Sequence, residues 1–192
     1  MIYSYSCVIL YPPCIWFSSY HCSQFKTNTV GPIHTTNAFL PLLRSGTLKK
    51  CITITSTVGS PQVCNTIGLD TQVPYAISKA AVNLAIAKFA ARYRDEGIVF
   101  LGITPGMVRT MQWCTYPPTC SRSPIDFLIT AEEEFEKFLG PITAKLRQAY
   151  PHFEGPITTE KSVKEMLGYI QTCTIADSGK LVHRDGRDFN SL

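Results

Sequence analysis

The segment from Tyr75 to Ile103, YAISKAAVNLAIAKFAARYRDEGIVFLGI, carries the clearest structural pattern in the chain. Its first part is apolar on nearly every side of a helix and gains charge only toward its end. Gly97 closes the helix, and the continuous apolar run Ile98–Ile103 is typical of a strand buried on both faces. A similar β-branched run, Lys50–Thr55, precedes the helix. These segments predict a strand–loop–helix–strand unit of a parallel sheet, and therefore an α/β protein.

Further elements are expected on either side of this unit. Val30–Arg44 has apolar side chains at helical spacing, with Gly46 placed as a helix stop, and Pro41 predicts a kink or an early end. The polar stretch Ser60–Val73 is expected to be a loop. Two more helices and a last strand complete the expected order: a helix near Ala131–Leu139, a helix over Ser162–Thr172 and a strand over Lys180–His183.

The composition is that of one globular domain, with 192 residues of which 45% are hydrophobic and 17% charged. The net charge of +4 forms no basic stripe, so no nucleic-acid partner is expected. No apolar run reaches about 18 residues, so no membrane span is expected. The eight cysteines show neither a C-x-x-C pair nor zinc spacing with histidine. This favours a reduced, cytoplasmic protein with buried thiols and no metal.

Residues 1–25 differ from the rest of the chain. They contain no Lys, Arg, Asp or Glu, and the pair Pro12-Pro13 interrupts their apolar runs. They therefore lack the charged start and the continuous apolar core of a secretory signal. One short strand over residues 6–10, SCVIL, is the only element expected there.

Tyr75 and Lys79 stand four residues apart and therefore lie on the same face of the helix. A cation beside a phenol stabilises the phenolate, so this spacing predicts a lowered pKa for Tyr75 and a proton donor tuned toward neutral pH. With nine tyrosines in the chain, the same spacing also arises readily by chance. Context favours function, because the two strands lead into Ser56 and into Thr104-Pro105-Gly106. In parallel sheets such carboxyl ends face one crevice, where ligands bind.

Four motifs occur in an order that resembles the short-chain dehydrogenase/reductase family. They are an Asn in FKTNTVGP, a Ser after a buried strand in ITITSTVGS, the Y-x-x-x-K of YAISK, and a strand ending in ITPGMVRT. The tail from Glu154 to Arg187, with Ser178-Gly179 before its strand, is similar to the closing helix and strand of carbonyl-reductase-like members. The resemblance covers the chain from about Phe25 onward, and implies a Rossmann-type, doubly wound parallel sheet.

The resemblance also implies catalytic roles for four residues. Tyr75 corresponds to the acid/base that exchanges a proton with a carbonyl or secondary alcohol, and Lys79 to the residue that lowers its pKa and binds the nicotinamide ribose. Ser56 corresponds to the hydroxyl that holds the substrate oxygen. Asn28 corresponds to the asparagine that fixes a water behind the lysine. Taken alone, Ser56 is more often an ordinary strand-end hydroxyl, while Asn28 is equally a cap of the following helix.

A nicotinamide cofactor, NAD or NADP, follows from the same resemblance, and the choice between the two stays open. Besides Tyr75 and Lys79, the residues implied in binding it are Pro105, Gly106, Val108 and Thr110. Taken alone, Pro105-Gly106 is most often only a turn. The following segment, residues 111–127, is expected to be a mobile lid over a small-molecule carbonyl or alcohol.

Two departures from the family pattern stand out. Ser56 and Tyr75 are nineteen positions apart, so NTIGLDTQ looks like an insertion beside the substrate. No two glycines are two residues apart, so the glycine-rich turn that lets a backbone approach a pyrophosphate is missing. The expected organisation is an atypical segment, 1–25, in place of the nucleotide-binding half, followed by the C-terminal part of a single Rossmann-type domain, 26–192.

Two readings of the function therefore stay open. One is an oxidoreductase that transfers hydride between NAD or NADP and a carbonyl or secondary alcohol, and that forms a homo-oligomer when complete. The other is a catalytically inactive truncated paralogue, or an incomplete gene model, that does not bind the cofactor. A serine hydrolase built on Ser56 is disfavoured, because the G-x-S-x-G elbow is absent.

Overall fold

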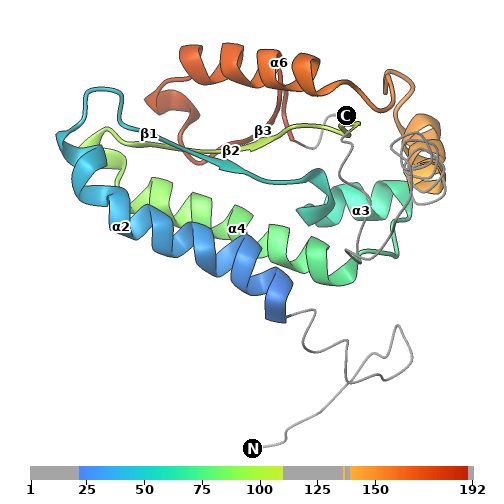
Figure 1. Ribbon diagram of the computed structural model, residues 1–192, viewed down its shortest axis with the longest axis horizontal. Coiled ribbons are helices and arrows are strands. Elements are labelled where there is room, and N and C mark those ends of the chain that lie inside the picture. Colours follow the sequence, from blue (N-terminus) through green and yellow to red (C-terminus); the bar gives the residue numbers. More distant parts are fainter. Residues whose placement is uncertain (1–21, 110–135, 137–138, 190–192) are drawn as a thin grey trace, which may run out of the picture.

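The computed structural model describes residues 22–109, 136 and 139–189 as a layered α/β unit (Figure 1). Its sheet has three parallel strands in the order β1-β2-β3. Helices α2 and α4 cover one face of the sheet and α6 covers the other, while α3 lies beyond the carboxyl ends of the strands. The α/β class and the parallel sheet predicted from the sequence are confirmed.

The described elements follow in chain order, with residues 22–25 and 139–149 also α-helical. They are the π-helix η1 (Lys26–Val30), α2 (Gly31–Ser45), β1 (Lys50–Ile54), the 3₁₀ turn η2 (Thr57–Gly59), α3 (Pro61–Ile67), α4 (Val73–Arg92), the 3₁₀ turn η3 (Arg94–Glu96), β2 (Val99–Thr104), α6 (Thr159–Thr172), the 3₁₀ turn η4 (Ile175–Asp177) and β3 (Leu181–His183). The strands expected over 50–55, 98–103 and 180–183, and the helices expected over 30–44, from residue 75 and over 162–172, are therefore present, with bounds shifted by a few residues.

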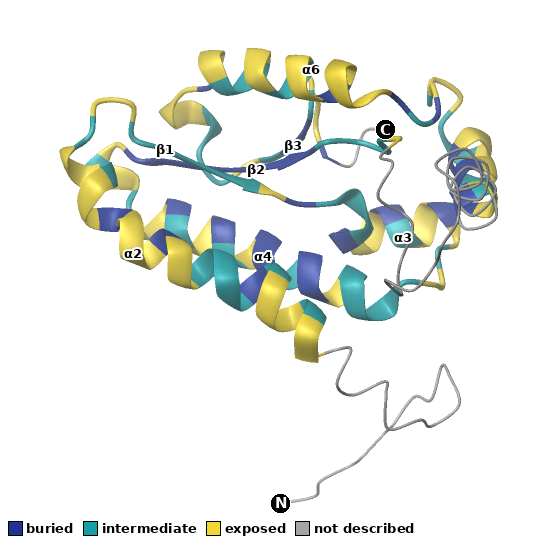
Figure 2. Cartoon of the chain, in the orientation of Figure 1, coloured by how far each residue is buried: buried dark blue, intermediate teal, exposed yellow. Residues whose placement is uncertain are grey.

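Strand β2 is the centre of the sheet and is buried on both faces, as its apolar sequence predicts (Figure 2). Val99, Leu101 and Ile103 pack toward α6, while Phe100 packs toward α2 and α4. Gly102 leaves room for the helix layer, because a Cβ there would lie 2.5 Å from Leu181 and 3.0 Å from Ile86. Strand β1 pairs with β2 along one edge and with no other strand in the described part of the chain.

The stretch expected to be a loop contains a helix, so that prediction is wrong. In α3 the Ser60 side chain accepts a hydrogen bond from the Val63 backbone, Pro61 occupies the first turn, and Gly68 ends the helix with φ +58°. Val63 and Ile67 are buried against the helix over residues 139–149. The signals for a cap, a first-turn proline and a terminal glycine were present in a segment whose polar composition concealed them.

Pro41 does not end its helix early, because α2 continues through it to Ser45, where the Gly46 N–H donates to Leu42 O. The helix is preceded by the π-helical turn η1, which the sequence did not predict. Several expectations lie outside the described residues: the strand over 6–10, the lid over 111–127, Thr110, and most of the helix near Ala131–Leu139.

Membrane and cysteine expectations are tested only within the described ranges. No helix there is long and apolar enough to cross a membrane. Cys22, Cys51, Cys64 and Cys173 are free thiols, but only Cys173 is buried and Cys22 is exposed, so the expected burial of thiols holds in part. A cytoplasmic location stays a prediction.

Leu101 provides a direct test of the central layer, since its side chain is 0% exposed between β2 and α6. We expect Leu101→Ala to lower the free energy of unfolding by about 2–5 kcal/mol, because it removes buried methyl groups and leaves a cavity. Leu48→Ala is the control, since Leu48 is 80% exposed, and its effect should stay within about 0.5 kcal/mol. Urea denaturation followed by circular dichroism measures both. Equal effects of the two substitutions would contradict the described core.

Candidate active site

The candidate site is a cleft of about 660 Å³ beyond the carboxyl ends of the strands. Five of the residues proposed from the sequence line it together: Ser56, Tyr75, Pro105, Gly106 and Val108. Lys79 and Asn28 instead line a second, more open hollow of about 520 Å³ between β1 and the start of α2. The described set therefore spans two neighbouring hollows.

Helix α4 is attached to the end of β1 by two buried side chains. Lys79 Nζ donates to Ile54 O at 3.1 Å, and Thr55 Oγ1 hydrogen-bonds the side chain of Asn83 one turn further on. The turn η2 packs directly on the same helix, because a Cβ on Gly59 would lie 2.8 Å from the backbone of Lys79. These contacts bring Ser56 beside Tyr75, although nineteen positions separate them in the sequence.

Tyr75 hydrogen-bonds Ser56, and its ring centroid lies 5.6 Å from Lys79 Nζ, so the predicted proximity of the three groups is confirmed. The predicted direction of its pKa is wrong. Burial raises the pKa of Tyr75 above its ordinary value, and the hydrogen bond with Ser56 offsets this only in part. Burial also lowers the pKa of Lys79. Desolvation is therefore the largest cause of both pKa shifts in the chain as described.

Asn28 is linked to the first turns of α4 through Ser78. Its Nδ2 donates to Ser78 Oγ at 3.0 Å and to Gln24 Oε1 at 2.8 Å, while Ser78 Oγ donates to Tyr75 O at 2.7 Å. The next residue, Thr29, donates from Oγ1 to Ser78 O at 2.8 Å. The alternative of a helix cap is wrong, because α2 begins at Gly31 with no side-chain cap bond. The wider π-helical turn lets two consecutive residues reach α4.

The backbone of the turn Pro105-Gly106 lies close to the side chain of Arg184. Gly106 has φ +80°, a conformation that favours glycine, and a Cβ there would lie 2.8 Å from Arg184 Nη1. Ser162 Oγ at the start of α6 donates to Pro105 O at 2.8 Å. Val108 forms a parallel bridge with Ile157. The backbone of this turn is therefore fixed from both α6 and the segment after residue 149.

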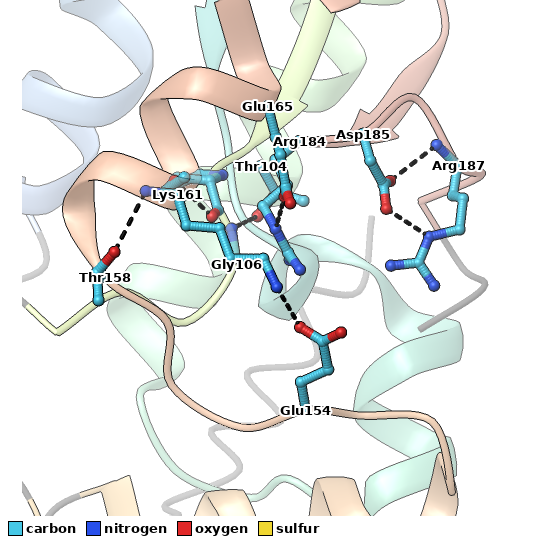
Figure 3. Close-up of polar contacts among 11 residues, drawn as sticks. Thr104, Gly106, Glu154, Thr158, Lys161, Glu165, Arg184, Asp185 and Arg187 are labelled. Atoms are coloured by element: carbon cyan, nitrogen blue, oxygen red, sulfur yellow. Dashed lines mark hydrogen bonds and ion pairs between the residues drawn. The ribbon is translucent and has the colours of Figure 1, made fainter. Parts of the chain in front are cut away.

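Charged side chains lie around Gly106 of this turn (Figure 3). Arg184 pairs with Glu165, Lys161 with Glu154 at 2.6 Å, and Arg187 with Asp185 at 2.7 Å. Positive and negative groups balance in these pairs. Sequence analysis missed the cleft residues Glu154, His183, Arg184 and Arg187 and the apolar wall formed by α3, because only the tertiary fold brings them to the strand ends.

The model of the family described as short chain dehydrogenase matches residues 20–117. The chain belongs to the short-chain dehydrogenase/reductase family. It is 41% identical over 151 residues to the short-chain dehydrogenase/reductase AacuF of Aspergillus aculeatus, a match that covers 78% of this chain and 51% of the relative. It is 36% identical over 167 residues to the short-chain dehydrogenase/reductase atnB of an Arthrinium species, covering 87% of this chain and 56% of that relative.

The fold resembles solved carbonyl reductases. The NADPH-bound carbonyl reductase from chicken fatty liver superposes with a TM-score of 0.61 at 23% identity, covering 88% of this chain and 56% of the other. The carbonyl reductase Sniffer of D. melanogaster gives 0.59 at 20% identity, covering 89% and 57%. These likenesses show the fold. The chain spans about half the length of the curated relatives that it matches.

The raised pKa of Tyr75 is measurable by difference titration. The near-ultraviolet absorbance of the wild-type chain minus that of Tyr75→Phe should show a phenol that ionises above its ordinary value of 10.0. Ser56→Ala should raise the midpoint further, because it removes a hydrogen bond to the phenolate. The folded state then holds its proton longer than the unfolded state, so stability falls as pH rises above 10.0. Tyr75→Phe should reduce this fall. A midpoint below 10.0 would show that Lys79 dominates instead.

Proposed function

We propose that this protein is an oxidoreductase that transfers hydride between a nicotinamide cofactor and a carbonyl or secondary alcohol, with Tyr75 as the acid/base. The observation that carries the proposal is the convergence of Tyr75 with the hydroxyl of Ser56 and the buried ammonium of Lys79. Membership of a family of oxidoreductases supports it.

In the proposed reaction Ser56 holds the substrate oxygen next to the phenol, since its hydroxyl both donates and accepts hydrogen bonds. Tyr75 then gives its proton to that oxygen. Because burial raises its pKa, the phenol keeps this proton at neutral pH until negative charge develops beside it. The ammonium of Lys79 then stabilises the phenolate that remains. Asn28 and Ser78 hold the helical turn that contains Tyr75 and Lys79.

The cofactor is a nicotinamide dinucleotide, NAD or NADP, and supplies or accepts the hydride when bound. The residues present fit its nicotinamide and ribose end. Pro105 and Gly106 line the same cleft as Tyr75, and Lys79 lines the neighbouring hollow. Val108 and Thr110 are proposed to meet the carboxamide. The chain offers no glycine-rich turn for the phosphates.

An inactive protein that binds no cofactor is the second reading, and two observations favour it. The outer edge of β1 has no partner strand in the described ranges, and no G-x-G occurs in the sequence. In a Rossmann-type sheet the dinucleotide phosphates lie at a helix N-terminus after such a turn. Catalysis by the proposed residues and binding of the cofactor phosphates are therefore tested by separate experiments.

A chimera tests the catalytic proposal. The N-terminal half of the Aspergillus aculeatus relative is joined to residues 20–192, and oxidation of NADPH or NADH is followed with 1-tetralone as the carbonyl probe. We expect Tyr75→Phe to lower kcat by about 10²–10⁴-fold, because the general acid is lost, and to leave cofactor affinity nearly unchanged. Lys79→Ala should impair both turnover and cofactor binding.

Tyr93→Phe is the matched control, because Tyr93 stacks on Phe89 in the core under the sheet, away from the cleft. It should keep turnover within about twofold, as a conservative change remote from the reacting groups does. Full turnover in Tyr75→Phe, beside an unchanged Tyr93→Phe, would show that the acid assignment is wrong.

We also propose that the complete protein is a homo-oligomer that uses α2 and α4. Phe39 and Leu42 on α2, and Ile77 and Leu84 on α4, are exposed large hydrophobic side chains. Sedimentation of the chimera at micromolar concentration should show a dimer or larger species that Leu84→Lys dissociates. Leu167→Lys on α6, also at an exposed leucine, should leave the assembly intact. A monomer without any substitution would contradict the proposal.

A further inference from the structure

The last residue of β3, His183, is a cleft-lining group with an unused hydrogen-bonding atom. The side chain is 2% exposed, and Nε2 has no hydrogen-bond partner in the described part of the chain. Its backbone is fixed, since His183 pairs with Thr104 in the sheet and its N–H donates to Arg187 O at 2.9 Å. A buried polar atom without a partner destabilises a fold unless a ligand or water completes it.

The surroundings of the ring decide what Nε2 can do. The imidazole stacks with Phe189 at 6.3 Å between centroids and hydrogen-bonds the Phe189 backbone. That bond raises the pKa of His183, so the ring donates it; because Nε2 has no partner, the donor is Nδ1. Burial has the largest effect and lowers the pKa of His183 below its ordinary value, which favours the neutral ring at neutral pH. Neutral imidazole with its proton on Nδ1 leaves Nε2 as an acceptor.

Charge around the ring selects a neutral donor. Asp185, Arg184 and Arg187 face the imidazole, and the two guanidinium groups would repel a cationic donor. Each of these guanidinium groups is already paired, Arg184 with Glu165 and Arg187 with Asp185 (Figure 3). Both ion pairs use the Nε atom of the arginine, and an anion has no proton to donate to the lone pair of Nε2. A hydroxyl group donates a proton to Nε2 and carries no positive charge for the guanidinium groups to repel.

One wall of the cleft is apolar. This wall is formed by buried aliphatic side chains of α3 and of the helix over residues 139–149, namely Val63, Ile67, Leu139, Ile142 and Leu146. A volume of about 660 Å³ suits a small organic molecule held mostly by apolar contacts and oriented by a few polar groups.

We propose that His183 is a substrate-binding residue whose Nε2 accepts a hydrogen bond from a hydroxyl group of the bound molecule. The substrate is then an apolar carbonyl compound that carries a neutral hydroxyl away from the carbonyl to be reduced. This inference rests on the proposed function for the identity of the carbonyl end. The binding of the hydroxyl end depends on His183 alone and needs no cofactor.

The test compares two ketones that differ by one hydroxyl, 1-tetralone and 6-hydroxy-1-tetralone. Each is titrated into the full 192-residue chain without cofactor, and the histidine side-chain nitrogens are followed by NMR. The 5-hydroxy and 7-hydroxy isomers extend the comparison to other placements of the donor. We expect at least one hydroxylated ketone to bind about fivefold more tightly than 1-tetralone, as one hydrogen bond provides. The same ketone should shift the Nε2 resonance of His183 to lower frequency, while 1-tetralone should not.

Two variants provide the matched control. His183→Gln places a carbonyl oxygen near the position of Nε2 and should keep most of the hydroxyl preference. His183→Asn keeps a donor near Nδ1 but has no atom at Nε2, and the ratio of the two affinities should fall to about one. Because 1-tetralone is the reference in every variant, a general loss of folding does not imitate this change of ratio.

Equal affinity of wild type for all four ketones, no binding of any, or a preference that survives His183→Asn would each overturn the proposal. Failure of the proposed function is seen separately, as a loss of the Tyr75 dependence of turnover in the chimera. Binding of the hydroxylated ketone with the expected histidine shift, in a protein that does not turn over, would support His183 as a binding residue and reject only the reduction step.

Discussion

The burial of the Lys79 ammonium at the end of β1 is the constraint on which the site depends. A buried charge must be hydrogen-bonded, and Lys79 meets this requirement with the carbonyl of Ile54 at 3.1 Å. The bond fixes the first turns of α4 at the carboxyl end of a strand. The same turns contain Tyr75. The packing of a helix on a sheet, and not a flexible loop, therefore positions its phenol next to Ser56. Thr55 and Asn83 repeat the attachment one turn further on.

Close packing allows this arrangement. Gly102 lets Ile86 of α4 reach β2, and Gly59 lets the turn after Ser56 lie against the backbone of Lys79. A larger residue at either position would move α4 away from the sheet, and the hydrogen bond to Ile54 would lengthen. The contacts of Asn28 and Thr29 with Ser78 press on the same turn from η1. Tyr75 is therefore held from three sides by elements that are distant in the sequence.

Much of this could be predicted from the sequence, because the signals were local. The i,i+4 spacing of Tyr75 and Lys79, the apolar run that became β2, and the polar residues directly after the strands all follow from short-range rules. Helix α3 was missed although Ser60, Pro61 and Gly68 marked its ends, since its composition resembled a loop.

Other features depend on the tertiary structure and leave no local signal. The sign of the Tyr75 pKa shift depends on how far the phenol is desolvated, and spacing along a helix does not give that quantity. The link from Asn28 to Ser78 spans 50 positions and requires a π-helical turn. Nε2 of His183 is identified as an acceptor because no described residue hydrogen-bonds it, and only a packed structure reveals this.

The proposed chemistry of the site and the binding of the cofactor phosphates depend on different parts of the protein. The residues proposed for proton transfer lie within this chain, while the glycine-rich turn that cradles a pyrophosphate is absent from its sequence. Fluorescence titration of the 192-residue chain with NADPH and NADH, beside the chimera that supplies such a turn, tests this separation most directly. The account predicts saturable micromolar binding by the chimera and none by the chain alone. Saturable micromolar binding by the 192-residue chain itself would contradict it.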